Sequence, residues 1–343
     1  EAFITRAMLV VRPLRSVLGR AGRFRARFTS TACSVSKDDR YLFDLNGFLV
    51  VRGVLTEQEV QVCNEAIDAR SEQLKTGERL EALRNTPKGS GWAGDGRTGR
   101  MDMAGMLGWG EPDGAPFRSI LAHHRLVPYF HTLLGKGYRL DHQPLLIAQD
   151  AGSEGFSLHG GTVDRLSGEY NPRLAYTYSH GTISTALLGV SVQLSDHNPG
   201  DGGFAVVRGS HKANFPMPVD MTLGKAHDEH VYQPVTKAGD VVLFSEGTVH
   251  GARAWTASHQ RRVALYRFSP AHIAYSRGYY PEWDEAITKG STPQELAVLQ
   301  PPFAPRVDRQ VLSEDGSQVH QDVRAEHKKA FDAKVFGSKK YFC

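Results

Sequence analysis

The chain has 343 residues, of which 40% are hydrophobic and 23% are charged, an ordinary composition for a globular protein with a sizeable core. It contains no run of 18 or more apolar residues, so we expect no transmembrane helix and no membrane partner. The net charge of +4 is concentrated near one end, so we expect no nucleic-acid partner. The sequence leaves the oligomeric state open.

The first 36 residues differ from the rest in charge. The stretch from Ala2 to Ser36 contains seven arginines and no acidic residue, and it ends in the hydroxyl-rich run FTSTACSVS. This composition is typical of an organelle transit peptide, although a disordered basic tail would share it. We expect residues 1–36 to direct the chain to a mitochondrion or plastid; without such a signal the chain would be cytoplasmic. Residues 37–343 are expected to form a single domain.

The body of the chain begins with a strand and a helix. The run GFLVVRGVL, residues 47–55, is apolar and β-branched and is bounded by glycine, which predicts a strand. Thr56 and Glu59 have the spacing of a capping box, and apolar residues at helical spacing predict a helix that continues to about residue 75.

A long loop and a second helical region follow. Residues 85–115 are rich in Gly, Pro and Asp, and loops of this length are usually functional. We expect a lid here, in which Arg97 and Arg100 either contact an anionic substrate group or are solvated charges. The run FRSILAHHRLVPYFHTLLG, residues 117–135, predicts a pair of helices that ends at Gly135.

The remainder of the body has the pattern of a β protein. Short apolar runs alternate with turn residues: YRLDHQPLLIAQD, TISTALLGVSVQLSD, GGFAVVRGS, GDVVLFSEG and RRVALYRFSP. Many short strands with turn signals predict a sandwich or barrel, here wrapped by the preceding helices. We expect the Pro-rich, charged extension 281–343 to cover the outside of this barrel.

Several of these segments together resemble one protein family. The order GFLVVRGVLTEQEV, LHGG, LSDHNPGDGGFAVVRGSHKANFP, AGDVVLFSEGTVHGA and RRVALYRFSP is similar to that of the phytanoyl-CoA dioxygenase family, over about residues 40–275. Members are non-haem Fe(II), 2-oxoglutarate-dependent dioxygenases. The resemblance implies a mainly β fold with helical additions, the double-stranded β-helix or cupin-like jelly roll.

The resemblance also implies an activity and its cofactors. These would be Fe(II), 2-oxoglutarate as co-substrate, and O₂. The implied reaction decarboxylates 2-oxoglutarate to succinate, and a ferryl oxidant removes a hydrogen atom from a small-molecule substrate, which is then hydroxylated. The substrate itself is not readable from the sequence.

Particular residues match the positions of the family's site. His159 and His250 match the two iron-binding histidines, and two imidazoles suit Fe(II). Arg261, eleven residues after His250, matches the arginine that binds the far carboxylate of 2-oxoglutarate by paired hydrogen bonds. Arg262 is adjacent, but only one of two successive strand residues can face the barrel interior, and the spacing favours Arg261. Two polar residues on the preceding predicted strand are further candidates to contact the co-substrate: Asp141 and Gln143.

Gly161 departs from the family pattern. It lies two residues after His159, where the family has the Asp of a His-x-Asp pair. Either a carboxylate from elsewhere, Asp164 or Glu246, completes the iron site, or the position is left to water. In a third interpretation chloride binds there, as in related halogenases with His-x-Gly or His-x-Ala; the loss of one negative charge beside the metal favours a halide.

These interpretations give one expected function and two alternatives. We expect a hydroxylating dioxygenase, with a 2-oxoglutarate-dependent halogenase as the first alternative. The second alternative belongs to another class, a jelly-roll protein that has lost its metal and binds a ligand without catalysis.

Overall fold

The computed structural model describes residues 35–74, 86–87, 89–275, 282–303 and 308–338. Everything described below belongs to one compact unit, residues 33–343. Most of the predicted transit segment, residues 1–34, lies outside the described residues. Within the described part of the chain, no helix is both long enough and apolar enough to cross a membrane.

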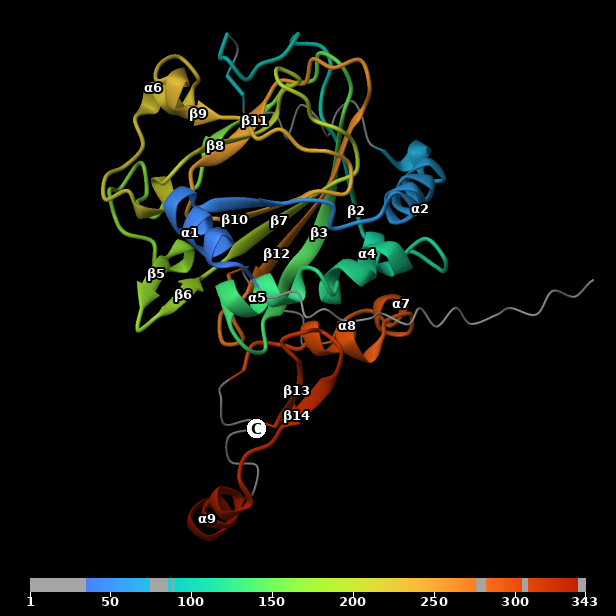
Figure 1. Ribbon diagram of the computed structural model, residues 1–343, viewed down its shortest axis with the longest axis vertical. Coiled ribbons are helices and arrows are strands. Elements are labelled where there is room, and N and C mark those ends of the chain that lie inside the picture. Colours follow the sequence, from blue (N-terminus) through green and yellow to red (C-terminus); the bar gives the residue numbers. More distant parts are fainter. Residues whose placement is uncertain (1–34, 75–85, 88, 276–281, 304–307, 339–343) are drawn as a thin grey trace, which may run out of the picture. The chain divides into compact units, whose positions relative to one another are not determined.

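Two antiparallel sheets lie face to face (Figure 1). The strands of the six-stranded sheet are, in spatial order, β1 (Phe48–Val51), β10 (Val241–Ser245), β7 (Leu188–Gln193), β12 (Arg261–Ser269), β3 (Arg139–Gln149) and β2 (Met101–Ala104). The strands of the four-stranded sheet are β4 (Phe156–His159), β11 (His250–Arg253), β8 (Gly203–Val207) and β9 (Val231–Tyr232). The predicted mainly β jelly roll is therefore confirmed.

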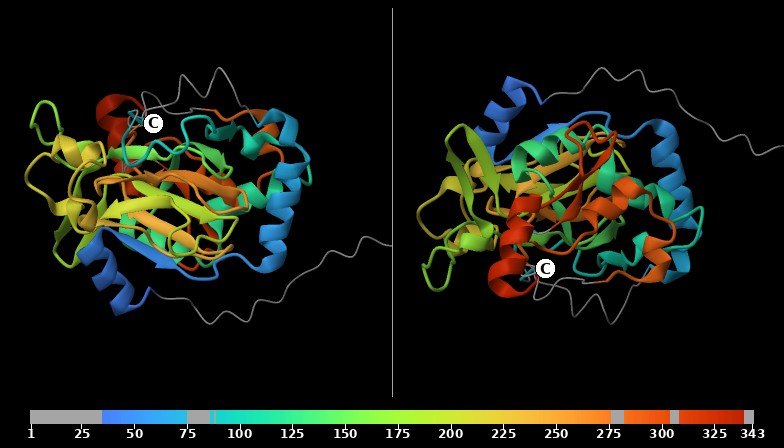
Figure 2. Two further views of the ribbon diagram at one scale, coloured as in Figure 1. Left: turned by 90° about the horizontal axis from the view of Figure 1, so that it is seen from above. Right: turned by 90° about the horizontal axis from the view of Figure 1, so that it is seen from below.

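Helices cover the outer face of the six-stranded sheet and both ends of β1 (Figures 1 and 2). They are α1 (Lys37–Asn46), α2 (Glu57–Asp68), α4 (Ala115–Ser119) and α5 (Val127–Leu134), with short 3₁₀ turns at Ser71–Gln73, Met106–Gly108 and Ile120–Ala122. The predicted capping box is present, since the Thr56 side chain accepts from the Glu59 N–H and the Glu59 carboxylate accepts from the Thr56 N–H. The α2 helix ends at Asp68, earlier than predicted.

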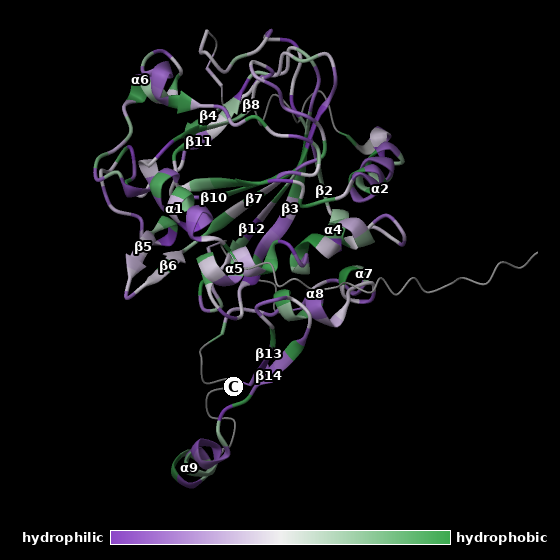
Figure 3. Cartoon of the chain, viewed as in Figure 1, coloured by the Kyte–Doolittle hydropathy of each residue, from purple (hydrophilic) through white to green (hydrophobic). Residues whose placement is uncertain are grey.

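The main core lies between this sheet and its helices. Leu146, Val190, Leu243 and Tyr266 point outward from their strands and pack with apolar residues of α2, α4 and α5. Figure 3 shows hydrophobic residues concentrated along the central strands. Because side chains alternate between the two faces of a strand, the other residues of these strands face the barrel interior, where the site described below is built.

Two segments differ from the prediction. Part of the expected lid, Met101–Ala104, is the edge strand β2, paired with β3, and Trp92 of the same loop is buried and donates its indole N–H to the Thr222 carbonyl. This strand was not predicted, because its polar residues and the many glycines around it are typical of a loop. The run predicted as one strand from residue 182 is divided, because β5 (Tyr176–Ser179) and β6 (Thr182–Thr185) form a separate hairpin before β7.

The remaining elements connect the sheets or form the C-terminal extension. The connecting elements are α6 (Val219–Thr222) and 3₁₀ turns at Pro172–Leu174, Ser210–Lys212 and Asp228–His230. The extension contains α7 (Glu285–Thr288), α8 (Pro293–Val298), β13 (Arg309–Leu312), β14 (Val319–Asp322) and α9 (Glu326–Phe336). The α8 helix packs against β3 and β13, on the outside of the barrel.

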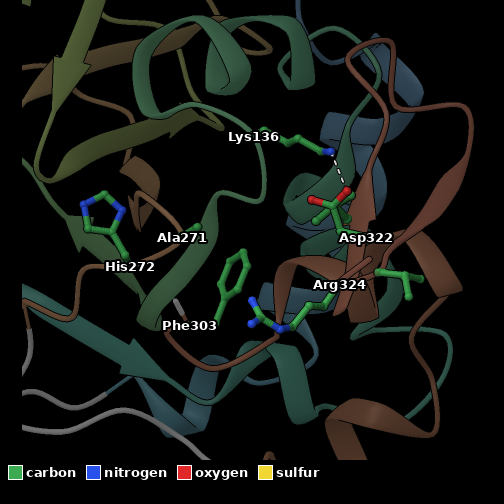
Figure 4. A pocket seen from close by; sticks show the side chains of 8 residues that line it. Lys136, Ala271, His272, Phe303, Asp322 and Arg324 are labelled. Atoms are coloured by element: carbon green, nitrogen blue, oxygen red, sulfur yellow. Dashed lines mark hydrogen bonds and ion pairs between the residues drawn. The ribbon is translucent and has the colours of Figure 1, made fainter. Parts of the chain in front are cut away.

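A cavity of about 380 Å³ lies where this extension meets the body (Figure 4). Its walls include Phe303, Arg324 and the Lys136–Asp322 ion pair, whose Nζ and Oδ1 atoms are 2.7 Å apart. None of the predicted site residues lines it, so it is separate from the site that the sequence indicates.

Candidate active site

Two histidines meet where β4 and β11 pair. His159 ends β4 and His250 begins β11, and the two are direct partners across the ladder. Directly opposite residues project from the same face of a sheet, and the two ring centroids are 4.3 Å apart. Residues ninety-one positions apart in the sequence thus lie side by side, as predicted.

The main chain fixes the orientation of both rings. His159 Nδ1 lies 3.0 Å from the Ser157 carbonyl oxygen and His250 Nδ1 lies 2.8 Å from that of Thr248. Because a carbonyl can only accept, each Nδ1 carries the hydrogen and each Nε2 keeps a free lone pair. This is the arrangement that metal-binding histidines generally have.

Both rings are neutral at neutral pH. Desolvation lowers the pKa of His250. His159 is an exposed residue, but desolvation of its ring together with the neighbouring His250 lowers its pKa to about 3. Both Nε2 atoms therefore offer a lone pair at neutral pH, without competition from protons.

Glu246 is the carboxylate beside this pair. Its Oε2 lies 3.6 Å from His250 Nε2, and its Oε1 accepts from Arg267 Nε at 2.6 Å. Burial alone would raise the pKa of Glu246, but the charge and hydrogen bond of Arg267 help to lower it, so the group is a carboxylate. In the part of the chain that the structure describes, no three His, Cys, Asp or Glu side chains already converge on one point as a complete metal site.

Arg261 lies inside the barrel at a second position. It is 4% exposed and crosses from β12 toward β8, since its Nε would be 2.9 Å from a Cβ placed on Gly203. Desolvation lowers its pKa to about 9, which leaves it charged at neutral pH. Among the described residues, no carboxylate forms an ion pair with it.

Two neutral side chains hold the Arg261 guanidinium. Gln149 Oε1 accepts from Nη1 at 2.5 Å, and His197 Nε2 accepts from Nε at 3.3 Å. Since Nε2 of His197 accepts, its hydrogen is on Nδ1, which donates to Thr236 Oγ1 at 2.8 Å. Desolvation and Arg261 lower the pKa of His197 to about 2, which preserves this acceptor.

The two positions are separated along one pair of strands. His250 is paired with Val206 of β8, and Arg253 with Gly203. Three residues along a strand span roughly 10 Å. The imidazole pair and the guanidinium therefore lie at two levels of the same barrel interior.

Part of the sequence matches a known family model. Residues 167–263 match the model described as Phytanoyl-CoA dioxygenase (PhyH), a stretch that contains His250 and Arg261. The resemblance predicted from the sequence is confirmed. His159 lies outside the matched stretch, so its place in the site comes from the structure and the motif alone.

Solved structures show the same fold. HygX from Streptomyces hygroscopicus with nickel, 2-oxoglutarate and hygromycin B bound has a TM-score of 0.55 and 23% identity, over 71% of this chain and 91% of that one. The same protein with iron bound has a TM-score of 0.51 and 23% identity, over 74% and 94%. EctD from S. alaskensis with 2-oxoglutarate and 5-hydroxyectoine has a TM-score of 0.51 and 18% identity, over 81% and 92%. The jelly roll of this chain is therefore the fold of these solved structures. No curated protein matches the sequence.

The structure gives protein partners to two of the residues predicted to contact the co-substrate, and it places a third at an irregular point of its strand. Arg262 points out of the barrel, where its Nη2 meets the Asp68 carboxylate of α2 at 2.6 Å, because it alternates with Arg261. Gln143 lies at a register shift in β3, and Gln149 rather than Gln143 contacts Arg261. Asp141 is buried among structural partners and accepts from His142 Nδ1 at 2.9 Å and from the Tyr275 N–H at 2.9 Å.

Asp164 and Arg100, two further candidates for the site, both have partners within the protein. Asp164 lies in an exposed turn, where its Oδ1 accepts from the N–H groups of Leu166 and Ser167. Arg100 forms a bidentate pair with Asp102 at 2.9 and 2.8 Å, so its charge is already compensated within the protein.

Three residues of the site were not predicted from the sequence. Gln149, His197 and Arg267 reach the site through strand pairing between distant segments. One signal was available for Gln149, because it ends a predicted strand just as Arg261 begins one, and the two are partners in the antiparallel ladder.

Proposed function

We propose that this chain is an Fe(II)- and 2-oxoglutarate-dependent dioxygenase that hydroxylates a small molecule. One observation carries the proposal: a buried guanidinium without an acidic partner among the described residues lies in the same barrel interior as two imidazoles with free Nε2 atoms. A buried charge is costly unless an opposite charge accompanies it. This pairing of features fits an anionic co-substrate that also binds a metal.

The histidine pair fits a ferrous ion. His159 and His250 would bind it through Nε2, and their Nδ1–H groups are already held by main-chain carbonyls. Neutral imidazole is a suitable ligand for Fe(II), and a site with few protein ligands leaves positions for the co-substrate and O₂. Bound together with 2-oxoglutarate, iron supplies the activation of O₂ for oxidation of a substrate C–H bond.

Arg261 would bind the far carboxylate of 2-oxoglutarate. Its guanidinium is held by Gln149 and His197, both neutral, so its charge stays available for the ligand. A planar guanidinium can donate two parallel hydrogen bonds to a carboxylate. The similar structures that hold 2-oxoglutarate support the same use of this fold.

Hydroxylation is favoured over the two alternatives. A halogenase would need room for a halide beside the iron, but a carboxylate, that of Glu246, already lies 3.6 Å from His250 Nε2. In a protein that had lost its metal, we would not expect two imidazoles with free Nε2 atoms to remain. Nor would we expect a buried arginine that forms no ion pair with a described carboxylate. The substrate is proposed to be a small molecule, as hygromycin B and 5-hydroxyectoine are in the similar structures.

Turnover of 2-oxoglutarate tests this function. With Fe(II), ascorbate and O₂, the purified chain should form succinate from 2-oxoglutarate. Candidate small molecules that accelerate this reaction should gain one oxygen atom, which mass spectrometry detects. Replacement of hydrogen by chlorine in the product would instead establish the halogenase, and no succinate under any condition would favour the non-catalytic protein.

A further inference from the structure

The carboxylate that completes the metal site has to come from somewhere other than residue 161. Gly161 has φ +89°, and a Cβ built on it would meet the Val249 side chain at 3.4 Å. Val249 packs with Leu158 and Met221 on the face of the sheet opposite to His250, because neighbouring strand residues alternate. A side chain at position 161 would thus point away from the imidazoles.

The two glycines after His159 have a different structural role. A Cβ on Gly160, which has φ +84°, would lie 2.7 Å from the Thr248 carbonyl oxygen and 2.9 Å from that of Glu246. Such contacts are too close for any side chain, so glycine allows the end of β4 to approach the backbone of residues 246–248. The HGG motif therefore brings His159 close to the segment that carries Glu246.

Glu246 is held in place from both sides. Its backbone N–H donates to the Leu187 carbonyl at 3.0 Å, at the end of β10. Arg267 Nε binds only Oε1, at 2.6 Å, and leaves Oε2 on the side of His250. The residue is 7% exposed, and its Oε2 lies 3.6 Å from His250 Nε2, so this oxygen faces the imidazole of His250.

Glu246 and His250 are nearly close enough to bind one metal ion. Metal–ligand bonds of about 2.1 Å at right angles place neighbouring donor atoms roughly 3 Å apart. Glu246 Oε2 and His250 Nε2 are 3.6 Å apart, so a small rotation of the Glu246 side chain would bring both onto one ion. The other candidate, Asp164, already uses its carboxylate within an exposed turn.

We propose that Glu246 is the third protein ligand of the metal and that Arg267 is the positioning residue that holds it. This inference rests on the proposed function, since it concerns the same ferrous ion. The site would then be a two-histidine, one-carboxylate triad, with its acid four residues before the second histidine instead of two residues after the first. The place that a halide would need is occupied by Glu246.

Metal affinity tests the inference without relying on turnover. Binding of Fe(II) to the full chain is measured anaerobically by titration calorimetry, for wild type, Glu246→Gln, Glu246→His and Asp164→Asn. Loss even of groups that orient a metal ligand costs about 10–100-fold in affinity, so Glu246→Gln should bind Fe(II) at least roughly 100-fold more weakly. Glu246→His restores a donor atom and should recover most of the affinity, and Asp164→Asn should match wild type.

The Arg267→Gln variant separates a metal ligand from a simple ion-pair partner. It keeps the carboxylate and should weaken Fe(II) binding by only about tenfold, whereas a residue needed only to pair with Arg267 would leave metal affinity unchanged in both variants. Thermal unfolding in the presence of EDTA checks that each variant is folded. If Glu246→Gln does not fold, the test compares the other two variants. An Fe(II) affinity that is much lower in Glu246→His than in Arg267→Gln would then contradict the inference.

The outcomes for this inference and for the function are distinct. Wild-type affinity in Glu246→Gln, with His250→Ala unable to bind Fe(II), overturns the role of Glu246 and leaves the function standing. Wild-type affinity in His159→Ala and His250→Ala overturns both. Chloride supplies a further test, because Glu246 at the metal predicts that chloride does not change 2-oxoglutarate affinity in the wild type, and a chloride-dependent affinity would contradict it.

Discussion

The two levels of the barrel interior are charged in different ways. At the histidine level, Glu246 and Arg267 neutralise each other beside two neutral rings. At the arginine level, Arg261 is buried, and its hydrogen-bond partners among the described residues are the neutral Gln149 and His197. The first level is electrically balanced without a ligand, whereas the second has a buried positive charge that forms no ion pair with a described carboxylate.

This difference indicates how each level responds to its ligand. The histidine level presents lone pairs to a cation and requires little rearrangement. The arginine level bears the cost of a buried charge until an anion arrives. We therefore expect loss of a histidine to affect the metal, and loss of Arg261 to affect only the anion.

The largest expected effect is that of His250→Ala. Without its Nε2, succinate formation from 2-oxoglutarate should fall by more than about 100-fold, because loss even of orienting groups around a metal costs 10–100-fold. The rate is measured with saturating Fe(II). His180→Ala is the control, since His180 is exposed at the turn between β5 and β6 and should leave the rate unchanged; a wild-type rate in His250→Ala would remove it from the site.

Replacing Arg261 should separate the two levels. Arg261→Met should weaken 2-oxoglutarate binding by about 3 kcal/mol, roughly 100-fold, and leave Fe(II) affinity nearly unchanged. It should not lower the free energy of unfolding of the ligand-free protein, because the buried charge forms no ion pair among the described residues and its removal ends the cost of burying it. Arg262→Met is the matched control on the opposite face of β12. Equal 2-oxoglutarate affinities in the two variants would contradict the assignment.

The glycines after His159 should differ in their effect on stability. Gly160→Ala should lower the free energy of unfolding by about 3 kcal/mol or more, since it adds a contact with the Thr248 and Glu246 carbonyls to a strained φ. Gly161→Ala has room for its Cβ and should cost only about 1–2 kcal/mol for its left-handed backbone. Urea denaturation measures both; a larger loss in Gly161→Ala would show that the approach of β4 to residue 246 is not what Gly160 provides.

Acid should destabilise the arginine level through His197. Its folded pKa of about 2 lies below the value of an unfolded histidine, so the unfolded chain binds one more proton between about pH 6.5 and pH 2. This contribution to stability is fully present above pH 6.5 and is lost as the pH falls. In His197→Gln, the slope of the free energy of unfolding against pH should decrease by about 1.4 kcal/mol per pH unit. An unchanged slope would indicate that His197 is protonated in the folded chain.

Local patterns in the sequence predicted most of the fold. The β-branched run before Thr56 and the capping box at Thr56 and Glu59 became β1 and the start of α2. Alternation along β12 correctly placed only one of Arg261 and Arg262 inside the barrel. These features depend on neighbouring residues, whose geometry is set by the strand or helix that they form.

The partners of the site residues could not be predicted in the same way. Gln149, His197 and Arg267 reach their partners through the register of strands that are distant in sequence, and no local pattern encodes that register. Position 161 is similar. The sequence shows that the acid is missing there, but it does not show in which direction a side chain at this position would point, because that direction depends on a positive φ. The edge strand Met101–Ala104 was hidden because its flanking glycines resembled a loop.

The most direct test of the account is the absorption spectrum of the anaerobic protein with Fe(II) and 2-oxoglutarate. A keto acid chelated to ferrous iron gives a visible charge-transfer band. We predict that this band appears in the wild type, is lost in His159→Ala and His250→Ala, and requires a much higher 2-oxoglutarate concentration in Arg261→Met. Absence of the band in the wild type at saturating Fe(II) and 2-oxoglutarate would contradict the shared metal and co-substrate site.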